Sequence, residues 1–186
     1  MNANKKRSLL PGFLNLVLIF YVGNGIAATA EEKSAYKADK DTASATYKVE
    51  RAKCDSLTDN PKDVCIAQAK AMRVQSDATA TANYKNTLSA RTSARKSIAD
   101  ANYDLAKAKC DSLVGNSKDV CIKEAKAAKV TAVAEAVEVK KVQDARVDTN
   151  ADIRKADYKV ALEKCDASTG AAKDACVAAA KSHYGQ

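Results

Sequence analysis

The sequence of 186 residues has no tryptophan, and both of its phenylalanines lie within the first 30 residues. From residue 31 onward the chain contains one proline, three glycines and one histidine. Glycine and proline are the usual interrupters of helices, so their scarcity permits long helices. Alanine and lysine, which lose little on entering a helix, are abundant, but alanine buries little apolar area per residue. This composition predicts a helical protein without a large globular core.

The lack of histidine and of glycine-rich motifs limits the chemistry of the chain. His183, three residues from the end, is predicted to be a solvent-exposed tail residue. Zinc sites usually need C-x2-4-C spacing or several histidines, and redox-active pairs are typically C-x-x-C; both patterns are absent. No G-x-S-x-G, H-E-x-x-H or phosphate-binding loop occurs either. We therefore expect no enzymatic activity, no cofactor and no metal site.

The first 30 residues have the layout of a secretory signal peptide. Lys5, Lys6 and Arg7 precede a short apolar run from Leu9 to Val22, and small residues follow. Cleavage after Ala30 fits the A-x-A pattern, and cleavage after Ala27 is the alternative. The apolar run falls short of the roughly 20 residues that span a bilayer. We expect a periplasmic protein without a membrane span, whose net charge falls from +8 to +5 when residues 1–30 are removed.

All six cysteines lie in three copies of one C-x10-C unit. "KCDSLTDNPKDVCIAQAK" at 53–70 returns as "KCDSLVGNSKDVCIKEAK" at 109–126 and as "KCDASTGAAKDACVAAAK" at 164–181. The period of 55 to 56 residues is long enough for a whole structural unit. Residues 31–186 are thus expected to form a single helical domain of three repeats, with hairpin turns near 54–65, 110–121 and 165–176.

Each unit contains signals that end one helix and start another. Asn60 and Asn116 are predicted N-caps, and Pro61 stands at the first helical position, where proline is tolerated. Gly115 and Gly170 can take the left-handed conformation that ends a helix. The third unit has Ala171 and Ala175 in place of Asn and Val, which predicts a looser turn.

The cysteines of each unit flank this helix break almost symmetrically. Chain reversal would bring them level on adjacent antiparallel helices, at the Cα separation of about 5.5 Å that a disulfide needs. Six cysteines allow 15 connectivities, so metal binding, thiol chemistry and other pairings stay open as alternatives. Structural disulfides within each unit fit an exported chain best. The predicted pairs are Cys54 with Cys65, Cys110 with Cys121, and Cys165 with Cys176.

A tyrosine stands seven residues before the first cysteine of each unit: Tyr47, Tyr103 and Tyr158. Seven residues are nearly two helical turns, so each tyrosine should face the partner helix and pack there, rather than form a ligand-stacking surface. Apolar residues at heptad spacing predict a coiled-coil seam of small residues. These residues are Ala94, Ile98, Ala101, Leu105 and Ala108, and then Val130, Val133 and Val137.

The predicted fold class is all-α, with elongated antiparallel helical hairpins or a coiled coil fastened at three turns. Both outer helices should lie at the same end of the long central hairpin, leaving two helices toward the Cys110 and Cys121 turn. Breaks at 77–87 or 144–152, rich in β-branched and cap-type residues, would instead give three compact hairpins. The favoured helices are 33–57, 61–113, 117–167 and 172–183.

The signal-like start, "YKVERAKCDSL", "GNSKDVCIKEAKA" and "YKVALEKCD" together resemble a group of small exported proteobacterial proteins rich in Ala and Lys. These carry units of the form Y-x6-C-D-x-L-x-G-N-x-K-D-x-C-x-x-E-A-K-A, and some are labelled TolA-like cell envelope proteins. The resemblance covers nearly the whole chain after the leader. It implies a helical periplasmic protein without catalytic residues.

Three functions are consistent with these features. The favoured one is a non-enzymatic interaction or structural protein of the cell envelope, with an unknown protein or envelope component as partner. The second is a holdase chaperone in the style of Skp. The third is weak binding to anionic surfaces, without specific nucleic-acid recognition, because acids and bases are interspersed along the chain. Its best basic clusters are Arg91, Arg95 and Lys96, and Lys123, Lys126 and Lys129.

Overall fold

The computed structural model of the protein describes residues 29–186, and within them it is all-α, as the sequence predicts. The predicted leader lies almost wholly outside these residues. None of the helices in 29–186 combines the length and apolarity needed to cross a membrane. The elements are α1 (Ala30–Lys53), the 3-10 turn η1 (Cys54–Ser56), α2 (Asp59–Lys85), α3 (Leu88–Cys110), α4 (Gly115–Cys165) and α5 (Gly170–Tyr184).

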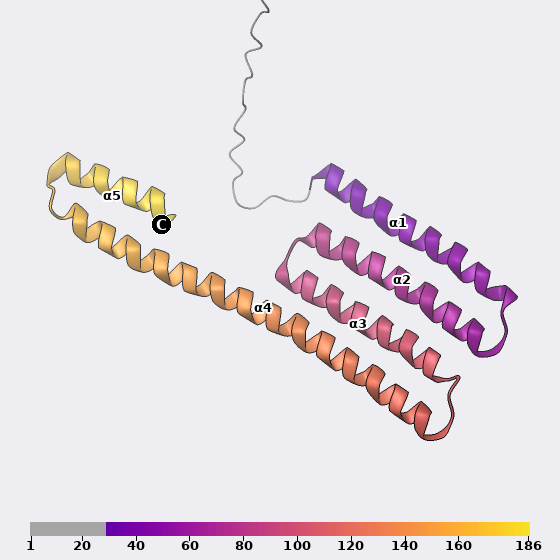
Figure 1. Cartoon of the computed structure of the whole chain (residues 1–186). Helices are drawn as coiled ribbons and strands as arrows, with labels where there is room; N and C mark the ends of the chain where they lie inside the picture. Colours follow the sequence, from indigo (N-terminus) through magenta and orange to yellow (C-terminus); the bar gives the residue numbers. More distant parts are fainter. Residues whose placement is uncertain (1–28) are drawn as a thin grey trace, which may run out of the picture.

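The helices form an open antiparallel layer rather than a closed bundle. Each helix contacts only its neighbours along the chain, so α1 touches neither α3 nor α4. Figure 1 shows α1, α2, α3 and the first half of α4 side by side, with α4 running on beyond the others to a hairpin with α5. Both faces of the four-helix layer therefore remain uncovered by other parts of residues 29–186.

The predicted long helix 61–113 is wrong, because the chain reverses at Asn86. This residue has φ 46°, in the left-handed region, and its N–H closes the end of α2 by donating to the carbonyl of Ala82 at 2.9 Å. Thr87 then starts α3, its hydroxyl accepting a hydrogen bond from the Ala90 N–H at 3.1 Å. Asparagine tolerates left-handed backbone and threonine is a good N-cap, so two adjacent residues make the turn.

This reversal also overturns the predicted arrangement of the outer helices. The turns at Cys54–Cys65 and Cys110–Cys121 lie at one end of the four-helix layer, while α5 lies far away at the other end of α4 (Figure 1). The two-helix part is thus the α4 and α5 arm, and not the Cys110 and Cys121 turn. In contrast to 61–113, α4 runs unbroken through 144–152.

The three disulfide turns start the following helix in the same way. Asp59, Gly115 and Gly170 are the first residues of α2, α4 and α5, with φ of 53°, 57° and 57°. The N-cap positions are held by the residues before them: Thr58, Val114 and Thr169.

The predictions of Asn60 and Asn116 as N-caps are therefore wrong, because each lies one residue inside its helix. Gly115 and Gly170 are left-handed as expected, but they open the next helix instead of ending the previous one. Pro61 is the third residue of α2, still within the first turn, where its missing N–H leaves no intrahelical bond unmade.

Every buried side chain in residues 29–186 belongs to alanine or cysteine, and the largest fully buried ones are three cysteines. Small residues in a seam allow two helices to approach closely. On α3 the burial of Ala94 agrees with the predicted seam. On α4 the prediction fails for Val130, which is 59% exposed, because Ala136 holds the buried position instead. The buried residues are Ala43, Cys54, Ala69, Ala71, Ala80, Ala82, Ala94, Ala99, Cys110, Ala136, Cys165 and Ala180.

The left-handed start of α4 makes a stability prediction. A Cβ added at Gly115 meets no atom within 4 Å, so Gly115→Ala adds backbone strain without a steric clash. We expect it to lower the free energy of unfolding by about 1 kcal/mol, and Gly115→Asn by clearly less, because asparagine tolerates this conformation. Urea denaturation followed by circular dichroism measures both. Equal losses for Ala and Asn would contradict the conformational explanation.

Candidate functional site

Each cysteine in the structure is bonded to the one eleven positions away. The pairs are Cys54–Cys65, Cys110–Cys121 and Cys165–Cys176, with Cα separations of 5.6, 5.7 and 5.6 Å, and no cysteine is free. These are the within-unit pairs that the spacing predicts. The Cα separation in the third turn is within 0.1 Å of that in the second, and its glycine has the same conformation, so the backbone of the turn is not looser at Ala171 and Ala175.

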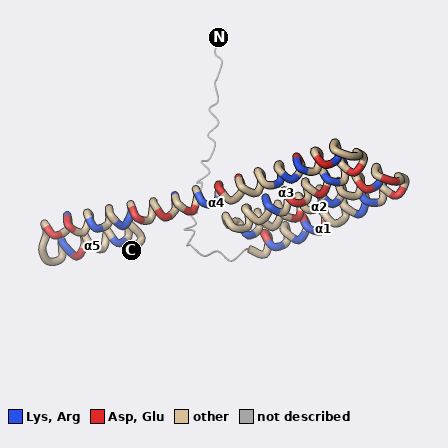
Figure 2. The backbone as a smooth tube through the Cα atoms, turned by 90° about the horizontal axis from the view of Figure 1, so that it is seen from below, with Lys and Arg blue, Asp and Glu red and all other residues tan. Residues whose placement is uncertain are grey.

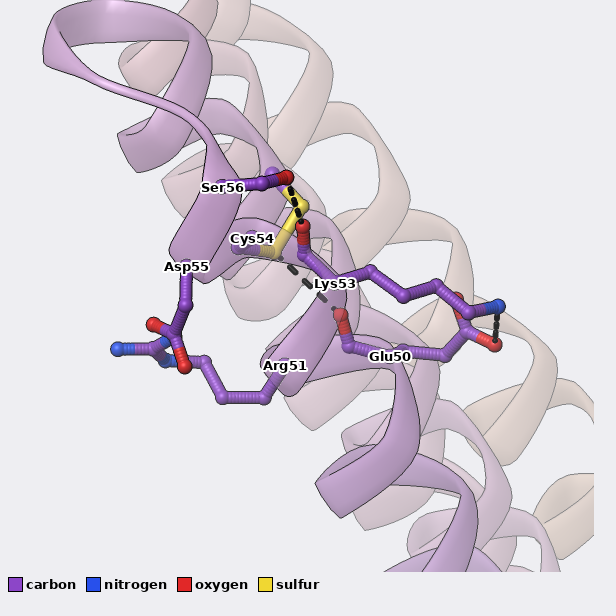
Figure 3. Close-up of polar contacts among 7 residues, drawn as sticks. Glu50, Arg51, Lys53, Cys54, Asp55 and Ser56 are labelled. Carbon is purple, nitrogen blue, oxygen red and sulfur yellow. Dashed lines mark hydrogen bonds and ion pairs between the residues drawn. A yellow bond between two sulfur atoms is a disulfide. The ribbon is translucent and has the colours of Figure 1, made fainter.

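Local contacts close the chain around the first disulfide, as Figure 3 shows. The Ser56 hydroxyl donates to the carbonyl of Lys53 at 3.1 Å, which stops the helix in a short 3-10 turn. Lys53 pairs with Glu50 at 2.7 Å along the last turn of α1. The Cys54 sulfur lies 3.4 Å from the Glu50 carbonyl oxygen; since a disulfide sulfur carries no proton, this is a packing contact.

An ion pair crosses the second and third turns at equivalent positions. The aspartate after the first cysteine pairs with the lysine three residues before the second: Asp111 with Lys118 at 2.9 Å, and Asp166 with Lys173 at 2.7 Å. In the first turn Asp55 pairs with Arg51 of its own helix instead. The repeated "CD" and "KD" letters carry this pair, which sequence reasoning missed.

These pairs shift the protonation of the aspartates. The hydrogen bond from Lys118 holds the pKa of Asp111 below its ordinary value of 3.8, and the hydrogen bond from Arg51 does the same for Asp55. A lowered carboxylate pKa stabilises the fold above the ordinary value, and this contribution is lost as the pH falls through the lowered pKa. Because both carboxylates are exposed, the ion pairs are small increments beside the disulfides.

Each repeat tyrosine contacts a side chain on the partner helix of its hairpin. In all three hairpins the contacted residue stands eight positions after the second cysteine. Arg73 lies over the Tyr47 ring at 5.2 Å from its centroid, and Lys129 over the Tyr103 ring at 5.3 Å. In the third hairpin the ring centroids of Tyr158 and Tyr184 are 6.1 Å apart. The tyrosines therefore pack across each hairpin, and their cation or aromatic partners form a further repeat position that the sequence analysis did not recognise.

Two more contacts hold the layer together, one between two hairpins and one within the first hairpin. The side-chain amide of Asn60 donates to the Ala108 carbonyl at 2.7 Å, which joins the start of α2 to the last turn of α3. This is the role of Asn60 in place of the predicted cap. At the opposite end of the layer, the rings of Tyr36 and Tyr84 stack at 4.6 Å between centroids. Asn116 has no comparable side-chain hydrogen bond among the described residues.

The predicted basic clusters are partly engaged in contacts within the chain. Lys129 forms an ion pair with Asp100 at 2.8 Å, and that hydrogen bond raises the pKa of Lys129 above its ordinary value of 10.5. Arg91 donates to the side-chain oxygen of Asn86 at the α2–α3 turn. Figure 2 shows both blue and red residues on every helix, but the first half of α3 carries Arg91, Arg95 and Lys96 without an acidic residue before Asp100.

Open grooves lie between the helices of the layer. One of about 740 Å³ is lined by α1, α2 and α3 and includes Tyr47, Arg73 and Asp77. Its lining contains acidic and basic side chains together with alanines, and no nucleophile lies beside a base in it. Within residues 29–186 no group of three or more potential metal ligands is assembled. The features that define this molecule are thus the three fastened hairpins and the helix surfaces between them.

No known family model matches the sequence, and neither a curated protein nor a solved structure does so. The resemblance to exported Ala- and Lys-rich proteins therefore stays a prediction.

The contact between Tyr103 and Lys129 can be measured with a double-mutant cycle. We expect Tyr103→Leu, Lys129→Met and the double variant to give a coupling of about 0.5 to 1 kcal/mol, the range of exposed cation–π contacts. The matched control pairs Tyr103→Leu with Lys126→Met, where we expect no coupling. Urea denaturation of the parent and of these single and double variants supplies the free energies. Zero coupling for Lys129 would show that the two side chains are neighbours without attraction.

Proposed function

We propose that the chain is exported to the periplasm, where its leader is removed, and that it acts there as a non-enzymatic helical interaction or structural protein of the cell envelope. The observation that carries the proposal is that all six cysteines form disulfides at helix turns, while the four-helix layer leaves its faces open. Such a molecule offers long helical surfaces of fixed spacing, and partner binding is the function that these surfaces support best.

The disulfides support an oxidising compartment. Disulfides persist in secreted and periplasmic proteins and are rare in the cytosol, where thiols are kept reduced. The first helix adds a detail about processing. Thr29 and Glu32 form a capping box at the start of α1, with reciprocal hydrogen bonds of 2.8 and 3.1 Å. Cleavage after Ala27 keeps this cap, whereas cleavage after Ala30 removes Thr29.

The exposed apolar side chains support an interaction role. Large hydrophobic residues are 40% or more exposed on α2 and along much of α4, among them Met72, Val130 and Val147. These residues stand singly among charged side chains. Such a surface suits binding to folded partners, whereas a holdase needs a broad, continuous apolar surface. Anion binding is weaker still as a candidate, because Arg73 and Lys129 already face tyrosines and aspartates of the chain.

Export is tested by trapping thiols in living cells. With the leader present, we expect all six cysteines to resist alkylation until a reductant is added. The matched control is the chain starting at Glu31 behind an initiator methionine, which stays in the cytosol and should be alkylated at once. Mass spectrometry counts the modified cysteines. Free thiols in the chain that carries the leader would contradict export.

The interaction role is tested by placing a photocrosslinking amino acid at Met72 or at Val130, both within the four-helix layer. We expect a discrete crosslink to an envelope component that is absent for the leaderless chain. A complete lack of crosslinks at both positions would contradict the proposal. Suppression of the aggregation of an unfolded outer-membrane protein by the purified chain would favour the chaperone alternative instead.

A further inference from the structure

No other helix of residues 29–186 lies beside the middle of α4. Counting equal steps from Cys110 and Cys121 brings Leu88, the start of α3, level with Gln143. Counting likewise from Cys165 and Cys176 brings Tyr184, the end of α5, level with Asp157. Every residue from 145 to 157 is accordingly exposed, and Figure 1 shows α4 running alone between the layer and α5. Most helices in proteins gain much of their stability from packing of an apolar face, and this part of α4 has no such packing within residues 29–186.

Exposed apolar residues lie on one side of α4 at both ends of this part and, at Ile153, within it. Val139, Val142, Ile153 and Val160 are 42%, 43%, 52% and 53% exposed, although such residues gain by burial. At 100° per residue this side lies about a third of a turn around α4 from the side that packs on α3 and α5. The α4 stripe is defined by positions that alternate by three and four: Val139, Val142, Arg146, Thr149, Ile153, Ala156 and Val160.

We propose that the α4 stripe binds the α4 stripe of a second copy of this chain, with the two helices antiparallel and Ile153 of each level with Ala156 of the other. Alternation by three and four residues is the spacing of a two-stranded coiled coil. The contact is isologous, so each pair of residues occurs twice around a twofold axis. From Arg146 to Glu163 the paired helices would extend over about 27 Å.

Charge selects the antiparallel arrangement. In a parallel pair Arg146 would face its own copy in the seam. At the flanks Asp152 would face Asp157 of the second copy, and Lys159 would face Lys164, so both pairs would repel.

In the antiparallel register Arg146 instead meets Glu163 of the second copy, and Asp152 meets Lys159. All four side chains are exposed, and none of them has an ion-pair partner within residues 29–186. The second copy thus offers each of these four side chains a partner of opposite charge.

This inference deepens the proposed interaction role, on which it rests, by naming one partner. It gives the exposed middle of α4 a covering helix, and it places the two four-helix layers at opposite ends of the assembly. Envelope components can then bind the layers, which the α4 contact leaves open. A protein that stays monomeric at every concentration would contradict self-association and leave the α4 stripe to a partner of another kind.

The test is sedimentation equilibrium of the oxidised protein, purified as the cell exports it. We expect a monomer–dimer equilibrium that Ile153→Asp weakens at least about tenfold in Kd. The matched control is Val147→Asp, which adds the same charge at a residue 59% exposed on the same helix but lies about a third of a turn away. It should leave the Kd within about threefold. Circular dichroism checks that both variants keep the parent helicity.

The register is tested by charge reversal. Asp152→Lys and Lys159→Glu should each weaken the dimer by up to about tenfold, because each change turns two attractive pairs into two repulsive ones. The double variant should return the Kd to near that of the parent. Three results would each overturn the proposal. The protein could stay a monomer at every concentration, Ile153→Asp and Val147→Asp could weaken the dimer equally, or the double variant Asp152→Lys with Lys159→Glu could fail to restore the Kd. Met72 and Val130, the two crosslinking positions, lie outside the α4 stripe. A monomeric protein would therefore contradict the dimer, whereas the interaction role would still be decided by the crosslinking result.

Discussion

The fold depends on the disulfide that closes each helical hairpin. Burial in residues 29–186 is confined to alanine and cysteine, and the three fully buried cysteine side chains are larger than any alanine around them. Alanine contributes little hydrophobic free energy per residue, so packing alone gives each helix pair modest stability. Closing a loop of this size is worth about 3 kcal/mol in the chain-entropy description, which exceeds any single noncovalent contact in the hairpin.

Around this covalent bond the chain repeats a set of weaker contacts. The tyrosine that faces a cation or a second ring, the left-handed first residue of the next helix and the ion pair across the turn recur at fixed distances from the cysteines. Each is exposed or half-exposed and is worth at most about 1 kcal/mol. Together these contacts orient the helices, whereas the disulfide holds the two helices of each hairpin together. This division explains how an open layer can be stable without a closed core.

The sequence was sufficient to predict the hairpins but not their assembly. The C-x10-C spacing and the glycines specify chain reversal locally, and heptad spacing predicts the seam of α3, where Ala94 is buried, but not that of α4, where Val130 is exposed. The break at Asn86 and Thr87 lies within 77–87, where the sequence predicted a break only as the alternative to a long helix. It was not favoured because neither residue is a strong interrupter alone; the pair works since asparagine ends one helix and threonine caps the next. Asn60 was misassigned for a related reason. Cap-type residues also serve as donors to neighbouring helices, and the target, the Ala108 carbonyl, is 48 residues away.

The most direct test of the account compares urea unfolding of the oxidised chain with that of the fully reduced and alkylated chain, followed by circular dichroism. The account predicts a much lower midpoint after reduction and a broad, poorly cooperative transition, because the alanine seams alone cannot hold the hairpins. An unchanged midpoint and slope in the reduced chain would show that packing suffices, and would contradict the central place given to the disulfides.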